Sequence, residues 1–198
     1  MPLPMTVLLD LDHTLIESVA WSKLSASVAP TRGAGNVPSH QGAKTARLAR
    51  DIARYEWYNI PDYVVCIRPH ARTFISMLYA AGHRVGVWTA ACGDYARDVI
   101  GLLGLDAMPL SYLMYDVHDK TGGKPLSTLF DLRETAVVIV DDNATVKTTQ
   151  PDHCIHIEPF YITSPDADVA LLHTAAKIAT MATQQFEPVT IHPVQTYK

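Results

Sequence analysis

The sequence predicts an α/β fold in which helices cover both faces of a central parallel sheet. Three short apolar runs have the continuous hydrophobicity of strands that are buried on both faces. Segments with helical spacing of apolar residues lie between these runs, and this alternation is typical of parallel α/β sheets. The chain has 198 residues, of which 48% are hydrophobic, which is enough for one domain with a buried core. We therefore expect a single domain over residues 1–198.

Each of the three apolar runs leads directly into a polar residue. Residues 6–9 precede Asp10, residues 84–88 precede Thr89, and residues 136–140 precede Asp141. A weaker apolar run at residues 154–157 predicts a further strand. Ligands of parallel α/β sheets bind beyond the carboxyl ends of the strands. The three polar positions therefore predict where a functional site lies.

Three helices are predicted between and after these strands. Residues 71–81 and 93–103 carry apolar side chains at helical spacing, and Gly82 and Gly104 supply stop signals. Residues 166–181 show the same spacing and predict a closing helix.

Residues 17–62 break the alternation and are expected to form an insertion, or lid, within the domain. Residues 25–42 are rich in Ser, Ala, Gly and Pro, which predicts a mobile loop. Residues 44–58 predict a helix. Four basic residues lie on or near one face of it, namely Lys44, Arg47, Arg50 and Arg54. Residues 182–198 are expected to form a C-terminal tail.

The composition favours a soluble intracellular protein, in the cytoplasm or the nucleus. Lysine and arginine number 16 against 20 aspartates and glutamates, so no overall charge attracts nucleic acid. No apolar run approaches the roughly 18 residues that a membrane span needs, and residues 1–5 lack the basic start of a signal peptide. The three cysteines include no CxxC pair and are expected to be free thiols. Neither a membrane nor a nucleic acid is expected as a partner.

Four carboxylates at two strand ends suggest a metal site. Asp10 and Asp12 follow the first strand, and Asp141 and Asp142 follow the third. Such carboxylates are also compatible with an ion pair or a helix cap. Carboxylates that are brought together repel one another, so their clustering makes sense around a divalent cation. Magnesium prefers a few carboxylate oxygens together with water and substrate phosphate, and it is the expected cofactor.

Two further residues would complete a phosphate cradle beside these carboxylates. Thr89 stands at the second strand end, and Lys124 follows a double glycine. A threonine hydroxyl donates a hydrogen bond to a phosphate oxygen, and a lysine ammonium offsets the charge of phosphate and carboxylates. Each element alone is a weak signal, but their order and their positions make the combination specific.

These residues resemble the four motifs of the haloacid dehalogenase (HAD) superfamily. The matching stretches are residues 10–15, residues 88–90, Lys124 and residues 141–142. The form DLDxTL is similar to the branch of RNA polymerase II carboxy-terminal-domain phosphatases and NLI-interacting-factor-like phosphatases. Further similar stretches are residues 67–70, 94–96 and 151–155. The resemblance implies a HAD-type, Rossmann-like three-layer fold with a small insertion.

The resemblance also implies the catalytic and metal-binding roles. Asp10 is the nucleophile that forms an aspartyl-phosphate intermediate, and Asp12 protonates the leaving oxygen and then activates water. Magnesium is bound by Asp10, by Asp142 and by the backbone carbonyl of Asp12. Asp141 belongs to the same acidic metal-binding group and is a candidate partner of Lys124.

The phosphate-binding residues implied by the resemblance are Thr14, Thr89, Ala90 and Lys124. Small members of the branch often carry an arginine about a dozen residues before the lysine, where this chain has Tyr112. Lys120 is the candidate substitute for that arginine. His13 takes a place that is often filled by glutamate.

The implied activity is that of a magnesium-dependent phosphoric monoester hydrolase that dephosphorylates phosphoserine or phosphothreonine in proteins. The partner is then a phosphoprotein or phosphopeptide, with the C-terminal tail of RNA polymerase II as one candidate. One alternative is a small-molecule or nucleotide phosphatase of the same superfamily. Another is a non-catalytic phosphoprotein-binding module. The presence of Asp12 argues against it, because a protein that only binds phosphate esters does not need a general acid.

Three weaker signals have simpler explanations. Only four residues separate Cys92 from Arg97, whereas a cysteine phosphatase loop has five. His153, Cys154 and His156 could suggest zinc, but alternate residues of a strand face opposite sides. The basic face at residues 44–54 is most often just solvated, and the alternative is that it guides an acidic phosphopeptide or nucleic acid to the pocket.

Overall fold

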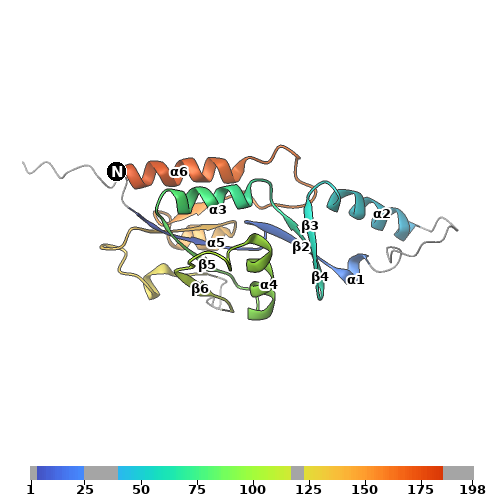
Figure 1. The fold of residues 1–198 in the computed structure, drawn as a ribbon, viewed down its shortest axis with the longest axis horizontal. Coiled ribbons are helices and arrows are strands. Elements are labelled where there is room, and N and C mark those ends of the chain that lie inside the picture. Colours follow the sequence, from blue (N-terminus) through green and yellow to red (C-terminus); the bar gives the residue numbers. More distant parts are fainter. Residues whose placement is uncertain (1–3, 25–39, 117–122, 185–198) are drawn as a thin grey trace, which may run out of the picture.

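The computed structural model describes residues 4–24, 40–116 and 123–184 (Figure 1). Two sheets and six α-helices occur in these ranges. The strands are β1 (Thr6–Leu9), β2 (Ile16–Ala20), β3 (Glu56–Ile60), β4 (Tyr63–Ile67), β5 (Arg84–Trp88), β6 (Tyr112–Met114), β7 (Val137–Asp141) and β8 (Cys154–His156). The helices are α1 (Trp21–Leu24), α2 (His40–Ile52), α3 (Ala71–Ala80), α4 (Gly93–Leu103), α5 (Ala144–Thr149) and α6 (Ala170–Gln184), with a 3-10 turn, η1, at Leu126–Thr128.

The larger sheet is parallel, five-stranded and has the order β6-β5-β1-β7-β8. Its central strand β1 pairs with β5 on one side and β7 on the other. In this register, Leu9 lies opposite Val87 of β5 and Val140 of β7. The amide of Asp10 donates to the carbonyl of Val140 at 3.0 Å, so the carboxyl ends of β1 and β7 lie level. The four predicted strands are confirmed, and β6 is an additional strand at the edge.

Helices cover both faces of this sheet, which confirms the three-layer α/β fold. Val7 and Leu9 of β1 point to a core formed with α3, α4 and α6. Leu8 between them points to a second core formed with η1 and α5. Figure 1 shows α3 and α6 side by side over one face. The alternation along β1 therefore buries every side chain of the strand, as its continuous apolar run predicts.

The predicted helices at residues 71–81 and 93–103 match α3 and α4 closely. The closing helix begins later than predicted, at Ala170, and continues to Gln184. Its start is set by Asp168, whose side chain accepts a hydrogen bond from the amide of Ala170 at 2.9 Å. A carboxylate in this position satisfies an amide of the first helical turn, which explains the later start.

A second, antiparallel sheet of order β2-β4-β3 occupies much of residues 16–67. The helix predicted over residues 44–58 is wrong in its second half, because α2 ends at Ile52 and residues 56–60 form β3. Trp57, Tyr58 and Ile60 are residue types that favour a strand, and β3 pairs with β4 along its length. Residues 40–42 of the predicted loop belong to α2, and residues 25–39 lie outside the described ranges.

The two faces of the antiparallel sheet serve different neighbours. Val65 and Ile67 of β4 belong to the core that includes α3 and α4. Val64 and Cys66, on the opposite face, belong to a separate small core with Ile52 of α2. The sheet therefore stands between α2 and the rest of the fold, as Figure 1 also shows.

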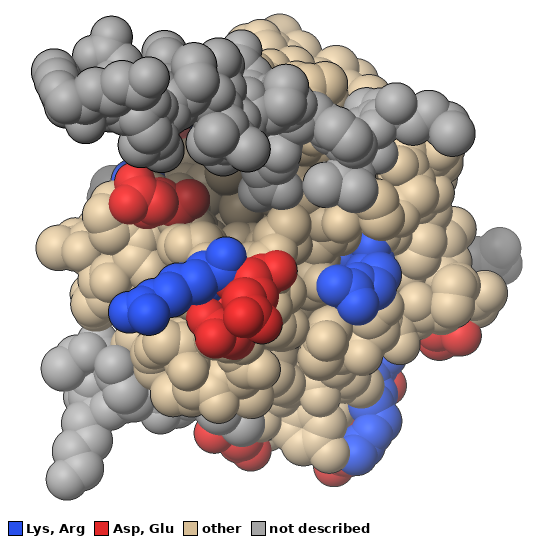
Figure 2. All heavy atoms as spheres, turned by 90° about the vertical axis from the view of Figure 1, so that its left-hand side faces the viewer, with Lys and Arg blue, Asp and Glu red and all other residues tan. Residues whose placement is uncertain are grey.

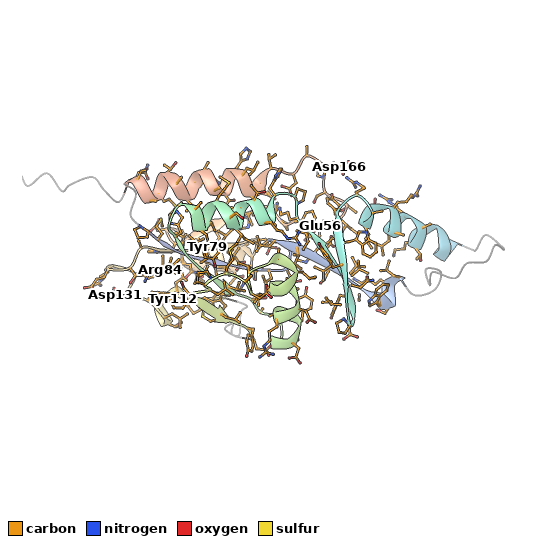
Figure 3. The ribbon with its side chains drawn as sticks, in the orientation of Figure 1. Glu56, Tyr79, Arg84, Tyr112, Asp131 and Asp166 are labelled. Atoms are coloured by element: carbon orange, nitrogen blue, oxygen red, sulfur yellow. The ribbon has the colours of Figure 1, made fainter. Side chains whose placement is uncertain are left out.

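The amino ends of the parallel strands lie at the end of the molecule away from the antiparallel sheet. Figure 2 views this end, where basic and acidic side chains of the described residues lie beside one another. Arg84 and Tyr112, at the starts of β5 and β6, lie there in Figure 3, whereas Glu56 and Asp166 lie toward the antiparallel sheet. None of the helices in the described part of the chain is long and apolar enough to cross a membrane.

Candidate active site

The carboxyl ends of β1 and β7 bring three acidic side chains together. Asp10 follows β1, Asp141 ends β7, and Asp142 is the next residue. One carboxylate oxygen from each of the three lies within 4.8 Å of the others. Asp10 and Asp141 are buried, and Asp142 is partly exposed. The structure thus places three of the four predicted metal-binding carboxylates at one point of the sheet edge.

Lys124 lies in the middle of this acidic group. Its Nζ donates to Oδ1 of Asp10 at 2.5 Å and to Oδ2 of Asp141 at 2.7 Å, and all three side chains are at least 91% buried. Gln150 holds the backbone around the lysine: its Nε2 donates to the carbonyl of Lys124, and its Oε1 accepts from the amide of Leu126, both at 2.9 Å. The sequence predicted a role for Lys124 but none for Gln150, because Gln150 belongs to no recognisable motif.

Burial is the largest single influence on the pKa of each of these groups. It raises the pKa of the Asp10 carboxyl to about 7, although the ammonium of Lys124 opposes this and the charge of Asp141 adds to it. Burial lowers the pKa of Lys124, but Asp10 and Asp141 outweigh it, so the pKa is raised overall. The pKa of Asp142 is also raised, first by burial and then by Asp141. The site is therefore short of positive charge.

The donor set suits a hard divalent cation. Three clustered carboxylates face one lysine, so a further positive charge would relieve their repulsion. Both oxygens of Asp141 already accept hydrogen bonds, Oδ2 from Lys124 and Oδ1 from the amide of Asn143 at 2.8 Å. This leaves Asp10 and Asp142 as the natural side-chain ligands, with Asp141 orienting the lysine. The carboxylate of Asp12 is not part of the group found among the described residues.

The side chain of Asp12 instead faces a cavity of about 590 Å³ between the antiparallel sheet and α4. Its Oδ1 accepts from the hydroxyl of Tyr95 at 2.5 Å and from the hydroxyl of Ser18 at 3.3 Å. Ser18 and Tyr95 also line the cavity, together with Tyr63, Asp62, Asp94, Asp98 and the turn at Ile60 and Pro61. Asp12 thus links the cavity to the acidic group, because it lines the cavity and its charge acts on Asp10.

The predicted phosphate-binding residues lie at the same edge of the sheet. Thr89 follows β5, and its Oγ1 accepts from the amide of Ala91 at 3.1 Å, which leaves the hydroxyl hydrogen available to donate. Ala90 is exposed beside it. Thr14 is fully buried, and its hydroxyl has no hydrogen-bond partner among the described residues.

Arg68 supports the loop after β1 that carries Thr14, a role that the sequence did not reveal. Only 2% of the residue is exposed. Its guanidinium donates to the carbonyl of Thr14 at 3.0 Å, to the carbonyl of Glu158 at 2.9 Å and to the carboxylate of Asp168 at 2.9 Å. An arginine directly after a buried strand was the available signal, since a charge in that position needs partners.

His13 adopts a left-handed backbone conformation, with φ of 59°, in the same loop. Its Nδ1 lies 3.2 Å from the carbonyl of Phe160, and its ring packs against Tyr161 at a centroid distance of 4.8 Å. The amide of Phe160 in turn donates to the carbonyl of His13 at 2.7 Å. These contacts join the loop after β1 to the segment before α6.

The remaining signals from the sequence have no role in the acidic group. Cys92 is exposed on the cavity wall, and Arg97 bonds to Asp94 at 2.8 Å and to Tyr115 at 3.1 Å. His153, Cys154 and His156 do not form a metal-binding group in the described ranges. Tyr112 packs against the ring of Phe130, and Lys120 lies outside the described residues.

The three-layer fold, with acidic side chains and a lysine at the carboxyl ends of its parallel strands, defines a haloacid dehalogenase-type hydrolase. A haloacid dehalogenase-like family hydrolase from Xanthomonas campestris has a similar fold, with a TM-score of 0.51 and 12% identity over 93% of this chain and 98% of that one. More particularly, the chain belongs to the NLI interacting factor-like phosphatases, whose family model matches residues 5–189.

The chain is also similar to a viral protein in sequence and to a solved phosphatase structure in fold. An uncharacterized protein, 037R, of Frog virus 3 (isolate Goorha) is 34% identical over 181 residues, which cover 81% of this chain and 87% of that protein. The structure of the fission yeast RNA polymerase II CTD phosphatase Fcp1, in a variant bound to beryllium fluoride, is similar with a TM-score of 0.56 and 17% identity. The similarity covers 92% of this chain, which spans about half, 51%, of that Fcp1 chain.

Proposed function

We propose that this phosphatase removes phosphate from phosphoserine or phosphothreonine in proteins, with magnesium and an aspartyl-phosphate intermediate on Asp10. The observation that carries the proposal is the position of Asp12 between the buried acidic group and a cavity of about 590 Å³. The cavity has room for a phosphorylated side chain and part of its flanking peptide. Fcp1, which has a similar fold, is a phosphatase of the RNA polymerase II C-terminal domain, so this tail is one substrate to test.

The first step transfers the phosphoryl group to the protein. A carboxylate oxygen of Asp10 forms a bond to phosphorus while the bond from phosphorus to the serine or threonine oxygen breaks. Asp12 gives its proton to that oxygen, so the leaving group departs as a neutral alcohol. Lys124 stays protonated and offsets the negative charge that the carboxylates and the phosphate bring together.

The second step returns the enzyme to its starting state. Asp12, now ionised, takes a proton from a water molecule that attacks phosphorus, and the bond to Asp10 breaks with release of phosphate. Thr14, Thr89 and the backbone at Ala90 would hold the phosphate oxygens in both steps. A magnesium ion held by Asp10, Asp142 and the backbone carbonyl of Asp12 would supply positive charge against the phosphate oxygens.

Asp10→Asn tests the mechanism directly. It keeps the size of the side chain but removes the nucleophile, so turnover of para-nitrophenyl phosphate with magnesium is expected to fall to background. Asp131→Asn is the matched control, because Asp131 lies at the amino ends of the strands in Figure 3 and its change should leave turnover intact. Full activity of the Asp10 variant would refute the proposed nucleophile.

The substrate class needs a separate comparison. A phosphopeptide panel that includes polymerase-tail repeats is assayed beside nucleotides and small phosphate esters, all with magnesium. We expect phosphoserine and phosphothreonine peptides to show the highest kcat/KM, because the cavity beside Asp12 extends between the antiparallel sheet and α4. A higher kcat/KM for nucleotides or sugar phosphates would favour the small-molecule alternative instead.

A further inference from the structure

Two hydroxyl groups converge on one oxygen of Asp12. Tyr95, in the first turn of α4, donates to Oδ1 at 2.5 Å, and Ser18, in β2, donates to the same atom at 3.3 Å. The two donors come from different layers of the fold, since α4 packs on the parallel sheet and β2 belongs to the antiparallel one. The second sheet therefore contributes a contact to a residue of the candidate active site.

The phenol of Tyr95 is held in place for this contact. Its ring meets the ring of Tyr63 edge to face, with a centroid distance of 5.3 Å and an interplanar angle of 74°. Burial, and then the charge of Asp12, raise the pKa of Tyr95, so the phenol keeps its hydrogen throughout the neutral range. Tyr95 is thus a fixed donor, and Tyr63 limits the movement of its ring.

Two donors on Oδ1 decide which oxygen of Asp12 carries the proton. An oxygen that accepts two hydrogen bonds has no favourable position for a hydrogen of its own, since this hydrogen would meet that of Tyr95. The proton of the neutral acid therefore resides on Oδ2, for which no protein donor is seen in the described ranges. The same two bonds restrict rotation of the carboxyl group, so Oδ2 keeps a constant direction.

We propose that Tyr95, assisted by Ser18, is a positioning residue that fixes Asp12 so that Oδ2 delivers the proton to the leaving oxygen. This inference rests on the proposed function, because it assumes that Asp12 is the general acid. In the first step the proton moves from Oδ2 to the ester oxygen as the bond from that oxygen to phosphorus breaks. In the second step a proton from the attacking water returns to Oδ2, and Oδ1 stays bound to the two hydroxyls throughout.

The test compares two substrates that differ in their need for an acid. Para-nitrophenolate leaves without protonation, whereas phenolate is a much poorer leaving group and gains far more from a proton donor. Tyr95→Phe keeps the ring against Tyr63 and removes only the hydroxyl. We expect its kcat/KM on phenyl phosphate to fall about tenfold or more, with less than a threefold change on para-nitrophenyl phosphate, since general acid catalysis is worth about 10²–10⁴-fold. The ratio kcat/KM is compared because it reports only the first step, whereas hydrolysis of the phospho-enzyme is common to both substrates.

Ser18→Ala should shift the ratio of the two kcat/KM values in the same direction but less, because its bond is longer. In an Asp12→Asn background, Tyr95→Phe should have no further effect on the ratio, because the acid through which it acts is gone. Tyr79→Phe is the matched control: the Tyr79 hydroxyl is buried on α3 and has no partner among the described residues (Figure 3). Its loss should leave both rates unchanged.

The outcomes separate the two proposals. Equal losses of kcat/KM on both substrates in Tyr95→Phe, or no loss on either, would overturn the positioning role while wild-type turnover and an inactive Asp10→Asn variant still support the phosphatase mechanism. An additional effect of Tyr95→Phe in the Asp12→Asn background would also overturn it. Failure of the proposed function is recognised differently, by a lack of magnesium-dependent turnover in the wild-type protein.

Discussion

Apart from the buried pair of Arg68 with Asp168, the parallel and antiparallel sheets differ in how far their ion pairs are exposed to water. In the parallel sheet, the ion pairs of Lys124 with Asp10 and Asp141 join side chains that are at most 9% exposed. Around the antiparallel sheet, the pair of Arg54 with Asp166 leaves these side chains 34% and 74% exposed. Charges interact more strongly away from water, and exposed pairs contribute about 0–1 kcal/mol. The parallel sheet thus holds the charged groups of the candidate site. The antiparallel sheet forms one wall of the cavity and contributes the neutral hydroxyls of Ser18 and Tyr63.

The largest loss of activity and stability is expected when the buried ammonium of Lys124 is removed. Lys124→Met leaves two buried carboxylates without their shared partner, and loss of one member of a buried pair costs about 3–5 kcal/mol of unfolding free energy. We expect kcat on para-nitrophenyl phosphate to fall about 10²–10³-fold, the usual loss when one charge-stabilising group is removed. Activity assays and thermal unfolding of the variant measure both effects.

Lys147→Met is the matched control for that variant. Lys147 lies on α5 and donates to the backbone carbonyls of Pro151 and Cys154 at 2.5 and 3.2 Å, and it has no carboxylate partner in the described part of the chain. Its loss should cost about 1 kcal/mol and leave kcat unchanged. An active, stable Lys124→Met protein would show that the buried ion pairs contribute neither to catalysis nor to the fold.

Magnesium should stabilise the protein through the buried carboxylates of the parallel sheet, by an amount that depends on pH. The pKa of Asp10 is raised from 3.8 to about 7, so without a cation the stability that this carboxyl contributes is present below its unfolded value and lost as the pH rises toward 7. The cation competes with protons for Asp10 and Asp142. Magnesium at about a hundredfold excess over its Kd should therefore add about 2.7 kcal/mol near pH 8, and much less near pH 5.

Thermal unfolding at both pH values, with and without magnesium, measures this effect. A gain of that size corresponds to roughly 5–10 °C in Tm for a chain of this length. Asp142→Asn should abolish most of the gain at pH 8, whereas Asp131→Asn should retain it. The same gain at both pH values would show that magnesium does not bind to the buried carboxylates.

The two sheets also differ in how well the sequence predicts them. Continuous apolar runs that lead into Asp10, Thr89 and Asp141 predicted the central strands and the edge where the site lies. A strand that is buried on both faces has consecutive apolar residues, and this pattern is easy to recognise in a sequence. The antiparallel sheet has mixed faces, and basic residues at helical spacing extended the predicted helix across β3. The bonds of Tyr95 and Ser18 to Asp12 join residues 83 and 6 positions apart, a proximity that only the packed fold creates.

The smallest effect is expected from the basic residues of α2. Lys44, Arg47 and Arg50 are exposed, and α2 packs through Ile52 on the face of the antiparallel sheet that carries Val64 and Cys66. The cavity beside Asp12 lies on the other face, which carries Ser18 and Tyr63. The sheet itself therefore separates these charges from the substrate, and mobile ions screen what remains beyond about 8–10 Å.

Lys44, Arg47 and Arg50 replaced together by alanine should thus leave kcat/KM within about twofold on both a phosphopeptide and para-nitrophenyl phosphate. Arg54→Ala is the informative comparison, because this guanidinium donates to Asp166 and, at 3.0 Å, to the carbonyl of Ser164. Its loss should lower the Tm with little change in kcat/KM, since it ties the antiparallel sheet to the segment before α6. A selective fall in kcat/KM on the phosphopeptide in the triple variant would instead show that α2 guides the substrate around the sheet.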